Sequence, residues 1–344
     1  MEQQRHGGDI YRNNCILDFS VNVNPLGIRK SVVEAIRNAA ERVDVYPDPS
    51  CQKLRRSISL YEGVKETEVL CGNGATALIY AVVLALKPKK ALLPAPTFSE
   101  YEQALNLAGT EIVYHKLRKE DEFAIDETIL SCITPDIDLL FLCNPNNPTG
   151  QVIKRSLLEQ VLNRCEKAGC YLVLDECFLD FLDEPWSYEM GKCVGKTSQL
   201  LVLKAFTKSF SIPGLRLGYV LGAEEVLKKT AVFLPEWDVS VLAQEAGVQA
   251  LQGAGTFLDR TRTFLKEERE YMKQELSALG FRVYDSKANY IFFEGDESLY
   301  DTLLQEGILI RDCSNYKGLS KGFFRVAVKT RKENERLLAC LKRL

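Results

Sequence analysis

The sequence predicts an α/β protein, with a mostly parallel sheet between helices and a smaller α+β lobe towards the C-terminus. Two features predict this fold class. Between residues 69 and 204, short apolar runs alternate with stretches of helical spacing, as where Val69–Cys71 precedes a helix expected over Ala75–Leu86. Beyond residue 240, a long helical region gives way to separate β-like runs and a last amphipathic helix. Strand–helix alternation favours parallel strands with both faces covered.

Three segments are expected along the chain. Residues 1–30 form an N-terminal arm, because Asn, Pro and Gly mark turns throughout it. Residues 31–240 form the large α/β domain, which begins with a helix that Ser31 can cap. Residues 241–344 form the small C-terminal α+β domain. A chain of 344 residues is long enough for two domains.

Composition and charge exclude several classes of protein. The formal charge of −3 and a pI near 5.7 argue against nucleic acid or an anionic membrane as partner. No apolar run approaches the ~20 residues of a membrane helix, and the polar N-terminus lacks a signal-peptide core, so a cytoplasmic protein is expected. Eleven cysteines without a C-x-x-C pair favour reduced thiols, and with two histidines no metal site is expected.

A glycine-rich turn follows the first apolar run. Gly72-Asn73-Gly74-Ala75-Thr76-Ala77 fits a relaxed G-x-G-x-x-A, but the acidic residue of a dinucleotide site is missing about 20 residues further on. Glycines and a hydroxyl at a helix N-terminus leave backbone N–H groups free for a phosphate. A tight strand–helix turn without a ligand explains the segment equally well.

Two polar side chains follow other buried strands. Asn147 lies in the loop 144–150 after an apolar run, and Asp175 ends the run Leu172–Leu174. The carboxyl ends of strands in an open parallel sheet are where ligands bind. A carboxylate at the end of a buried strand needs a cationic or donor partner, and a pyridinium nitrogen would be one.

A lysine follows the apolar run Leu200–Leu203. Lys208 has Thr207 beside it, and Arg216 stands at the start of the next β-like run. Most lysines are solvated surface charges. In combination with the other strand ends, however, Lys208 is a plausible covalent anchor for an anionic carbonyl cofactor, and the set as a whole suits pyridoxal 5′-phosphate.

At this point the sequence resembles the fold-type-I pyridoxal-phosphate enzymes of the aminotransferase class I/II family. The resemblance covers essentially the whole chain and rests on the order of six motifs: Gly-Asn-Gly, Pro-Thr-Phe, Asn-Asn-Pro-Thr-Gly, Asp-Glu, Thr-Lys and Gly-Leu-Arg-Leu-Gly-Tyr. It implies a seven-stranded type of sheet, pyridoxal 5′-phosphate as cofactor, and a homodimer with shared active sites.

The resemblance also implies a role for individual residues. Lys208 is the covalent anchor and Asp175 the partner of the ring nitrogen, and these two are the expected catalytic residues. Asn147 contacts the phenolic oxygen and Arg325 the substrate α-carboxylate. Tyr46 reaches the phosphate of the neighbouring subunit. The remaining cofactor residues are Phe98 for ring stacking and, for the phosphate, Gly74, Ala75, Thr76, Thr207 and Arg216.

Two branches of the family compete: decarboxylases of O-phospho-L-threonine that serve cobalamin nucleotide-loop synthesis, and histidinol-phosphate aminotransferases. The arm with His6-Gly7-Gly8, the run 308–316 and Phe178 at the position of a usual tyrosine resemble the decarboxylases. Ala205 and the residues after Trp237 depart from that branch, so O-phospho-L-serine stays open as a substrate.

A substrate clamp follows as a hypothesis. Arg311 and Arg325, with His6, Gly7, Asn22 and Asn147, would hold the substrate carboxylate and phosphate, because planar arginine forks bind such groups bidentately. The bond that stands perpendicular to the cofactor ring then decides the reaction. A non-catalytic binding protein is the third reading, and a nicotinamide-dependent dehydrogenase the fourth.

Overall fold

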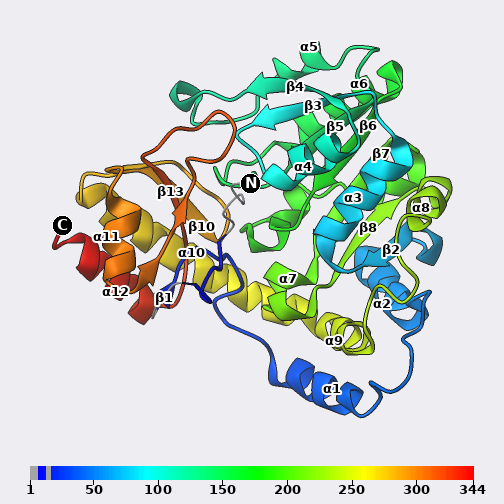
Figure 1. Cartoon of the computed structure of the whole chain (residues 1–344), viewed down its shortest axis with the longest axis horizontal. Helices are drawn as coiled ribbons and strands as arrows, with labels where there is room; N and C mark the ends of the chain where they lie inside the picture. Colours follow the sequence, from blue (N-terminus) through cyan, green and yellow to red (C-terminus); the bar gives the residue numbers. More distant parts are fainter. Residues whose placement is uncertain (1–6, 13–16) are drawn as a thin grey trace.

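The computed structural model describes residues 7–12 and 17–344 (Figure 1). Its centre is a seven-stranded sheet in the order β2-β8-β7-β6-β5-β3-β4. The strands are β2 Val69–Gly72, β3 Lys90–Ala95, β4 Glu111–Lys116, β5 Leu139–Cys143, β6 Tyr171–Asp175, β7 Leu200–Ala205 and β8 Gly218–Gly222. Strand β8 runs antiparallel to its neighbours β2 and β7, and all the other pairs are parallel. The predicted mostly parallel sheet is confirmed.

Both faces of this sheet are buried, which explains the continuous apolar runs in the sequence. Along β5, Leu140 and Leu142 belong to one hydrophobic core, and Leu139 and Phe141 belong to another. Helices α3 Gly74–Leu86, α4 Ser99–Leu107 and α8 Glu224–Ala231 cover one face. Helices α2 Gln52–Glu62, α6 Arg155–Ala168 and α9 Val241–Leu251 contribute to the core on the other face, near α5 Ile129–Cys132.

A smaller lobe lies beside the large sheet (Figure 1). Its antiparallel sheet has the order β12-β13-β10-β9. These strands are β9 Arg282–Val283, β10 Tyr290–Glu294, β12 Arg311–Asp312 and β13 Phe323–Ala327, with helices α10 Ala254–Ala278, α11 Leu299–Gln305 and α12 Arg331–Leu341. The long helical region expected after Trp237 is two helices, because Gly253 takes φ +66° between α9 and α10.

The N-terminal arm is built into the small lobe. Strand β1 Leu17–Asp18 pairs in parallel with β11 Ile308–Leu309, and Phe19 is fully buried in the small lobe's core. Helix α1 Lys30–Ala40 instead packs against α9. The division at residues 30 and 240 stays a prediction.

Two negative findings concern the part of the chain that the structure describes. There, no helix combines the length and the apolar character needed to cross a membrane. Within the same residues, His, Cys, Asp and Glu side chains form no group of three or more suited to a metal ion.

Candidate active site

The predicted site residues gather at the carboxyl edge of the large sheet. Strand β6 ends at Asp175, and β7 continues into helix α7 Phe206–Ser209, which carries Lys208. The register places Cys143 of β5 opposite Asp175, and Asp175 opposite Leu203 of β7. Parallel strands end at one edge, and this edge carries both Asp175 and Lys208, which are 33 positions apart in the sequence.

Lys208 is mostly buried and faces an aromatic ring. Its Nζ lies 5.7 Å from the ring centroid of Phe178. Burial, and then the positive charge of Arg325, lowers the pKa of Lys208 to about 8. None of the described carboxylates forms an ion pair with it. An amine of this kind is neutral, and therefore nucleophilic, in about a tenth of molecules at pH 7, far more than at the ordinary pKa of 10.5.

Asp175 is buried and held by two donors. Its Oδ2 accepts a hydrogen bond from Tyr101 Oη at 2.6 Å, and its Oδ1 accepts one from the backbone N–H of Cys177 at 2.9 Å. Burial, and then the charge of Asp175, raises the pKa of Tyr101, so this hydroxyl stays a donor. Tyr101 was not predicted from the sequence. Its place three residues after Phe98 on a helix was the available signal, and the two rings meet edge to face at 5.5 Å.

The glycine-rich turn closes tightly around a guanidinium group. Gly74 has φ +84° at the start of α3, and a Cβ there would lie 2.8 Å from Nη2 of Arg216. A Cβ on Gly218 would lie 2.6 Å from the backbone nitrogen of Ala75. The N-terminus of α3 and Arg216 therefore form one cationic cup, which suits a phosphate. Thr76 lies in the first turn of α3, and Thr207 is buried in α7.

Asn147 and the two arginines form a connected group. Asn147 Oδ1 accepts hydrogen bonds from Nη1 of Arg325 and, at 3.2 Å, from Oη of Tyr316. Arg325 Nη2 also donates to the carbonyl of Ser20 at 2.9 Å. Arg311 on β12 is the register partner of Arg325 on β13, so the two guanidinium groups start from opposite positions of one small sheet.

The N-terminal arm reaches this group. A Cβ on Gly7 would lie 2.4 Å from the carbonyl oxygen of Ser20, which is the oxygen that Arg325 contacts. Asn22 is 1% exposed, and its Oδ1 has no hydrogen-bond partner among the described residues. His6, which was predicted to bind substrate, lies outside the described residues.

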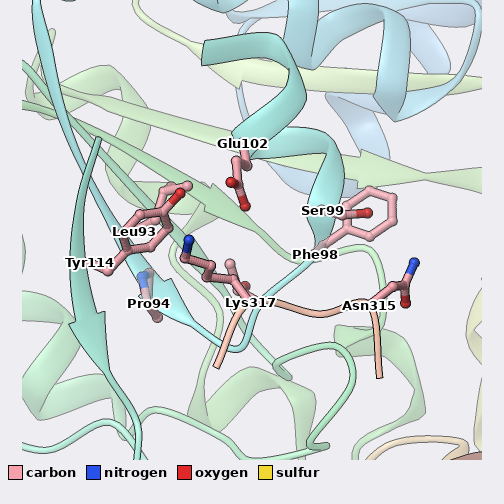
Figure 2. A pocket seen from close by; sticks show the side chains of 9 residues that line it. Leu93, Pro94, Phe98, Ser99, Glu102, Tyr114, Asn315 and Lys317 are labelled. Atoms are coloured by element: carbon pink, nitrogen blue, oxygen red, sulfur yellow. The ribbon is translucent and has the colours of Figure 1, made fainter. Parts of the chain in front are cut away.

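The loop after β12 borders the ring-stacking side chain. Figure 2 shows Asn315 and Lys317 of this loop around a pocket that Phe98, Ser99 and Glu102 of the α4 region also line. A Cβ on Gly318 would lie 3.2 Å from the carbonyl of Ala95, the last residue of β3. The small lobe therefore packs directly on the edge of the large sheet.

Tyr46 lies at the surface. Its side chain is 75% exposed and packs against Trp237, with ring centroids 4.4 Å apart and ring planes tilted by 30°. The following residue, Asp238, accepts a hydrogen bond from the backbone N–H of Asn73 at 2.7 Å, next to the cationic cup. No described contact joins Tyr46 to Lys208 within one chain.

Comparison with known proteins shows the family to which the chain is related. The model of the family "Aminotransferase class I and II" matches residues 14–341. The chain belongs to this family. It is 37% identical to threonine-phosphate decarboxylase of Salmonella typhimurium, over 98% of the chain and 95% of that protein.

Solved structures of class I and II aminotransferase relatives share the fold. Histidinol-phosphate aminotransferase from Clostridium acetobutylicum has a TM-score of 0.88 and 33% identity, over 95% of this chain and 98% of that one. L-threonine-O-3-phosphate decarboxylase from Porphyromonas gingivalis has a TM-score of 0.83 and 25% identity, over 95% and 99%. The predicted fold type I is confirmed.

The family depends on pyridoxal 5′-phosphate, so the predicted cofactor is confirmed. The residues present fit this group. Lys208 has an amine of lowered pKa for the covalent link, Asp175 offers a buried carboxylate, and Gly74 lets the N-terminus of α3 approach Arg216 more closely than a residue with a Cβ would. The roles of Phe98 and Asn147 beside the ring stay predictions.

Proposed function

We propose that this chain is a pyridoxal-phosphate-dependent decarboxylase of O-phospho-L-threonine. Its product would be 1-amino-2-propanol phosphate, the amino-alcohol phosphate used in cobalamin nucleotide-loop synthesis, and O-phospho-L-serine would be a second candidate substrate. The observation that carries the proposal is the pair Arg311 and Arg325, opposite each other on β12 and β13 and both buried. Two guanidinium groups match a substrate with two anionic groups.

The clamp residues would bind different groups of the substrate. Arg325 contacts Asn147 and the arm through Ser20, and would bind the substrate α-carboxylate beside the cofactor ring. Arg311 donates to the carbonyl of Asp312 at 2.6 Å and to Asn315 Oδ1 at 2.7 Å, and would hold the substrate phosphate with Gly7 and His6. Asn22 supplies a buried Oδ1 for a donor on the substrate.

The way in which these residues bind the substrate would decide which bond at Cα breaks. Bound pyridoxal phosphate supplies an electron sink for the pair left at Cα. Arg325 and Arg311 would hold the substrate by its carboxylate and phosphate, and Asp175 and Asn147 would hold the cofactor, so that the Cα–carboxylate bond is the one that breaks. Lys208, with its pKa lowered to about 8 by burial, would carry at Nζ the proton that takes the place of the lost carboxylate at Cα.

One incubation tests the proposal. The protein, loaded with cofactor, is given O-phospho-L-threonine, and we expect CO₂ and 1-amino-2-propanol phosphate in equal amounts. Glutamate formed from 2-oxoglutarate and histidinol phosphate, without CO₂ release, would establish the aminotransferase instead. That alternative is supported by the likeness to histidinol-phosphate aminotransferases, among them the Clostridium acetobutylicum structure.

A non-catalytic binding protein is a weaker alternative. It predicts that the anchor or the ring partner is lost, but Lys208 is present and mostly buried, and Asp175 is present and buried. A cofactor-loaded protein without a visible absorption band that borohydride abolishes would support it.

The roles of the clamp residues can be separated from those of the cofactor residues. Arg311→Ala removes hydrogen bonds to a charged group, so we expect KM for O-phospho-L-threonine to rise roughly 10- to 100-fold. The dissociation constant of pyridoxal phosphate should change much less. Equal loss of both affinities would contradict the assignment of Arg311.

The proposal includes a homodimer with shared sites, in the cytoplasm and without nucleic-acid partners. The exposed Tyr46 and its neighbour Trp237 support a surface that a second copy covers. Mixing two inactive variants, Tyr46→Ala and Lys208→Ala, should restore activity, because a hybrid dimer has one site with both native groups. Activity that stays at the sum of the two separate variants would rule out sharing.

A further inference from the structure

Tyr316 is a buried residue in the loop after β12, and it contacts both halves of the site. Its Oη lies 3.2 Å from Oδ1 of Asn147, 169 positions earlier in the chain. Its ring lies beneath Arg311, with the guanidinium carbon 5.1 Å from the ring centroid. No motif assigned it a role beyond its place in the run 308–316.

The hydroxyl of Tyr316 limits how Asn147 can orient. A side-chain amide oxygen has two lone pairs, and here the hydroxyl of Tyr316 and the guanidinium of Arg325 donate to them. The amide nitrogen is then the part of Asn147 left to face a ligand. Phe178 has no hydroxyl to contribute on the side of Lys208, so the orientation of Asn147 has more weight in this chain.

The ring of Tyr316 supports Arg311 by a separate interaction. Arg311 uses Nη1 and Nη2 for Asp312 and Asn315 at the two ends of the same short segment. A guanidinium over an aromatic face is stabilised by the ring's negative face. The hydroxyl and the ring of Tyr316 can therefore be removed one at a time.

We propose that Tyr316 is a positioning residue that fixes Asn147 for the cofactor through its hydroxyl and Arg311 for the substrate through its ring. The inference rests on the proposed roles of Asn147 and Arg311. In this arrangement the strand that binds substrate and the amide that contacts the cofactor's phenolic oxygen move as one unit.

The first test uses Tyr316→Phe, with Tyr284→Phe as matched control. Tyr284 is equally buried, and its hydroxyl donates to Glu294 in the small lobe, away from the site. A donor to the phenolic oxygen stabilises it as an anion and weakens its hold on the proton of the lysine–cofactor link. Looser positioning of Asn147 should therefore raise the pH midpoint of the visible absorption change by about 0.5 unit, the size of one modest hydrogen bond.

The outcomes are distinct. The same midpoint in Tyr316→Phe, Tyr284→Phe and wild type would overturn the role of the hydroxyl, and a midpoint shift in both variants would show a merely structural effect and overturn it too. A wild type that takes up no cofactor would overturn the proposed function itself, and this inference with it.

The second test uses Tyr316→Leu, which removes the ring as well. We expect Tyr316→Phe to keep KM for O-phospho-L-threonine near that of wild type, and Tyr316→Leu to raise it about 3- to 10-fold, the size of one cation–π contact. Melting of the cofactor-free proteins checks that both variants are folded. A KM that rises equally in Tyr316→Phe and Tyr316→Leu would overturn the division between hydroxyl and ring.

Discussion

Two lysines four residues apart show how this chain gives one residue type two opposite functions. Lys204, the last residue but one of β7, is buried among carboxylates: its Nζ lies 3.0 Å from Glu62, 3.5 Å from Glu176 and 4.0 Å from Glu189. Lys208 has no such partner among the described residues and shares its surroundings with Arg325 instead.

The surroundings decide the charge of each amine. Burial favours the neutral amine at both positions. Around Lys204, the charges of Glu62 and Glu176 outweigh burial and raise the pKa well above its ordinary value. At Lys208, burial and Arg325 act in the same direction and lower the pKa to about 8. Lys204 is therefore a permanent cation, whereas Lys208 can lose its proton at a lower pH than an ordinary lysine, as its proposed role as nucleophile requires.

The largest expected effect is the loss of turnover in Lys208→Ala. Without the amine there is neither covalent anchor nor proton carrier, so we expect kcat to fall by at least about 10³-fold. The borohydride-sensitive visible band should disappear, while circular dichroism stays that of wild type. Residual activity near the wild-type rate would disprove the assignment of Lys208.

Lys204→Met should leave the chemistry intact and lower stability. The change leaves Glu62 and Glu176 buried without their cation, which costs about 3–5 kcal/mol of unfolding free energy. Lys228→Met is the control, since its pair with Glu224 is exposed and exposed ion pairs contribute little to stability. Denaturant unfolding measures both, and equal losses in the two variants would show that the cluster around Lys204 has no special weight.

The pH dependence of the cofactor-free protein should separate the two lysines further. The pKa of Lys208 is about 8 in the folded chain and 10.5 ordinarily, so between these values the unfolded chain binds more protons and stability rises with pH. Below pH 8 the folded chain bears the full free-energy cost of keeping the protonated amine of Lys208 buried. Cofactor-free Lys208→Met should therefore be more stable than wild type by roughly 2–4 kcal/mol at pH 7.

This advantage should shrink as the pH rises from about 8 towards 10.5. Urea unfolding at several pH values measures it. A difference between Lys208→Met and wild type that does not vary with pH would mean that the amine is not perturbed in the folded chain.

The two lysines also mark what could be predicted from the sequence. The strand–helix alternation is a local pattern, so the parallel sheet and the edge that carries Asp175 and Lys208 could be predicted from it. The ion pairs of Lys204 could not be predicted from the sequence. Lys204 directly follows the apolar run of β7, and its closest carboxylate, Glu62, lies 142 positions earlier on α2. Neither hydrophobic periodicity nor a sequence motif predicts a contact between residues so far apart in the chain.

The same limit applies within the active site. Asp175 was predicted as a buried carboxylate, but its donor Tyr101 comes from α4, and only the packing of α4 on the sheet brings the hydroxyl to it. Tyr316 and Asn147 meet only because the small lobe closes on the large sheet. Residues at strand ends can be predicted from the chain, whereas the side chains that orient them depend on how separate elements pack.

A matched pair of tyrosines gives the smallest and sharpest test of the comparison. Tyr219 donates its hydroxyl to Glu62 in the cluster around Lys204, and Tyr101 donates its hydroxyl to Asp175 in the active site. Both tyrosines are buried, and each hydrogen bond to a carboxylate is worth about 1.5–3 kcal/mol. Tyr219→Phe and Tyr101→Phe should therefore lose similar unfolding free energy without cofactor.

Only one of the two should change the chemistry. In Tyr101→Phe, Asp175 keeps the N–H of Cys177 but loses its other donor, so its orientation towards the ring nitrogen is less fixed. We expect a lower kcat and a shifted visible absorption there, and wild-type values for both in Tyr219→Phe. If Tyr219→Phe changed the absorption as much as Tyr101→Phe, the cluster around Lys204 and the site around Lys208 would be one electrostatic unit, because a single missing hydroxyl on one side would then be felt at the cofactor on the other.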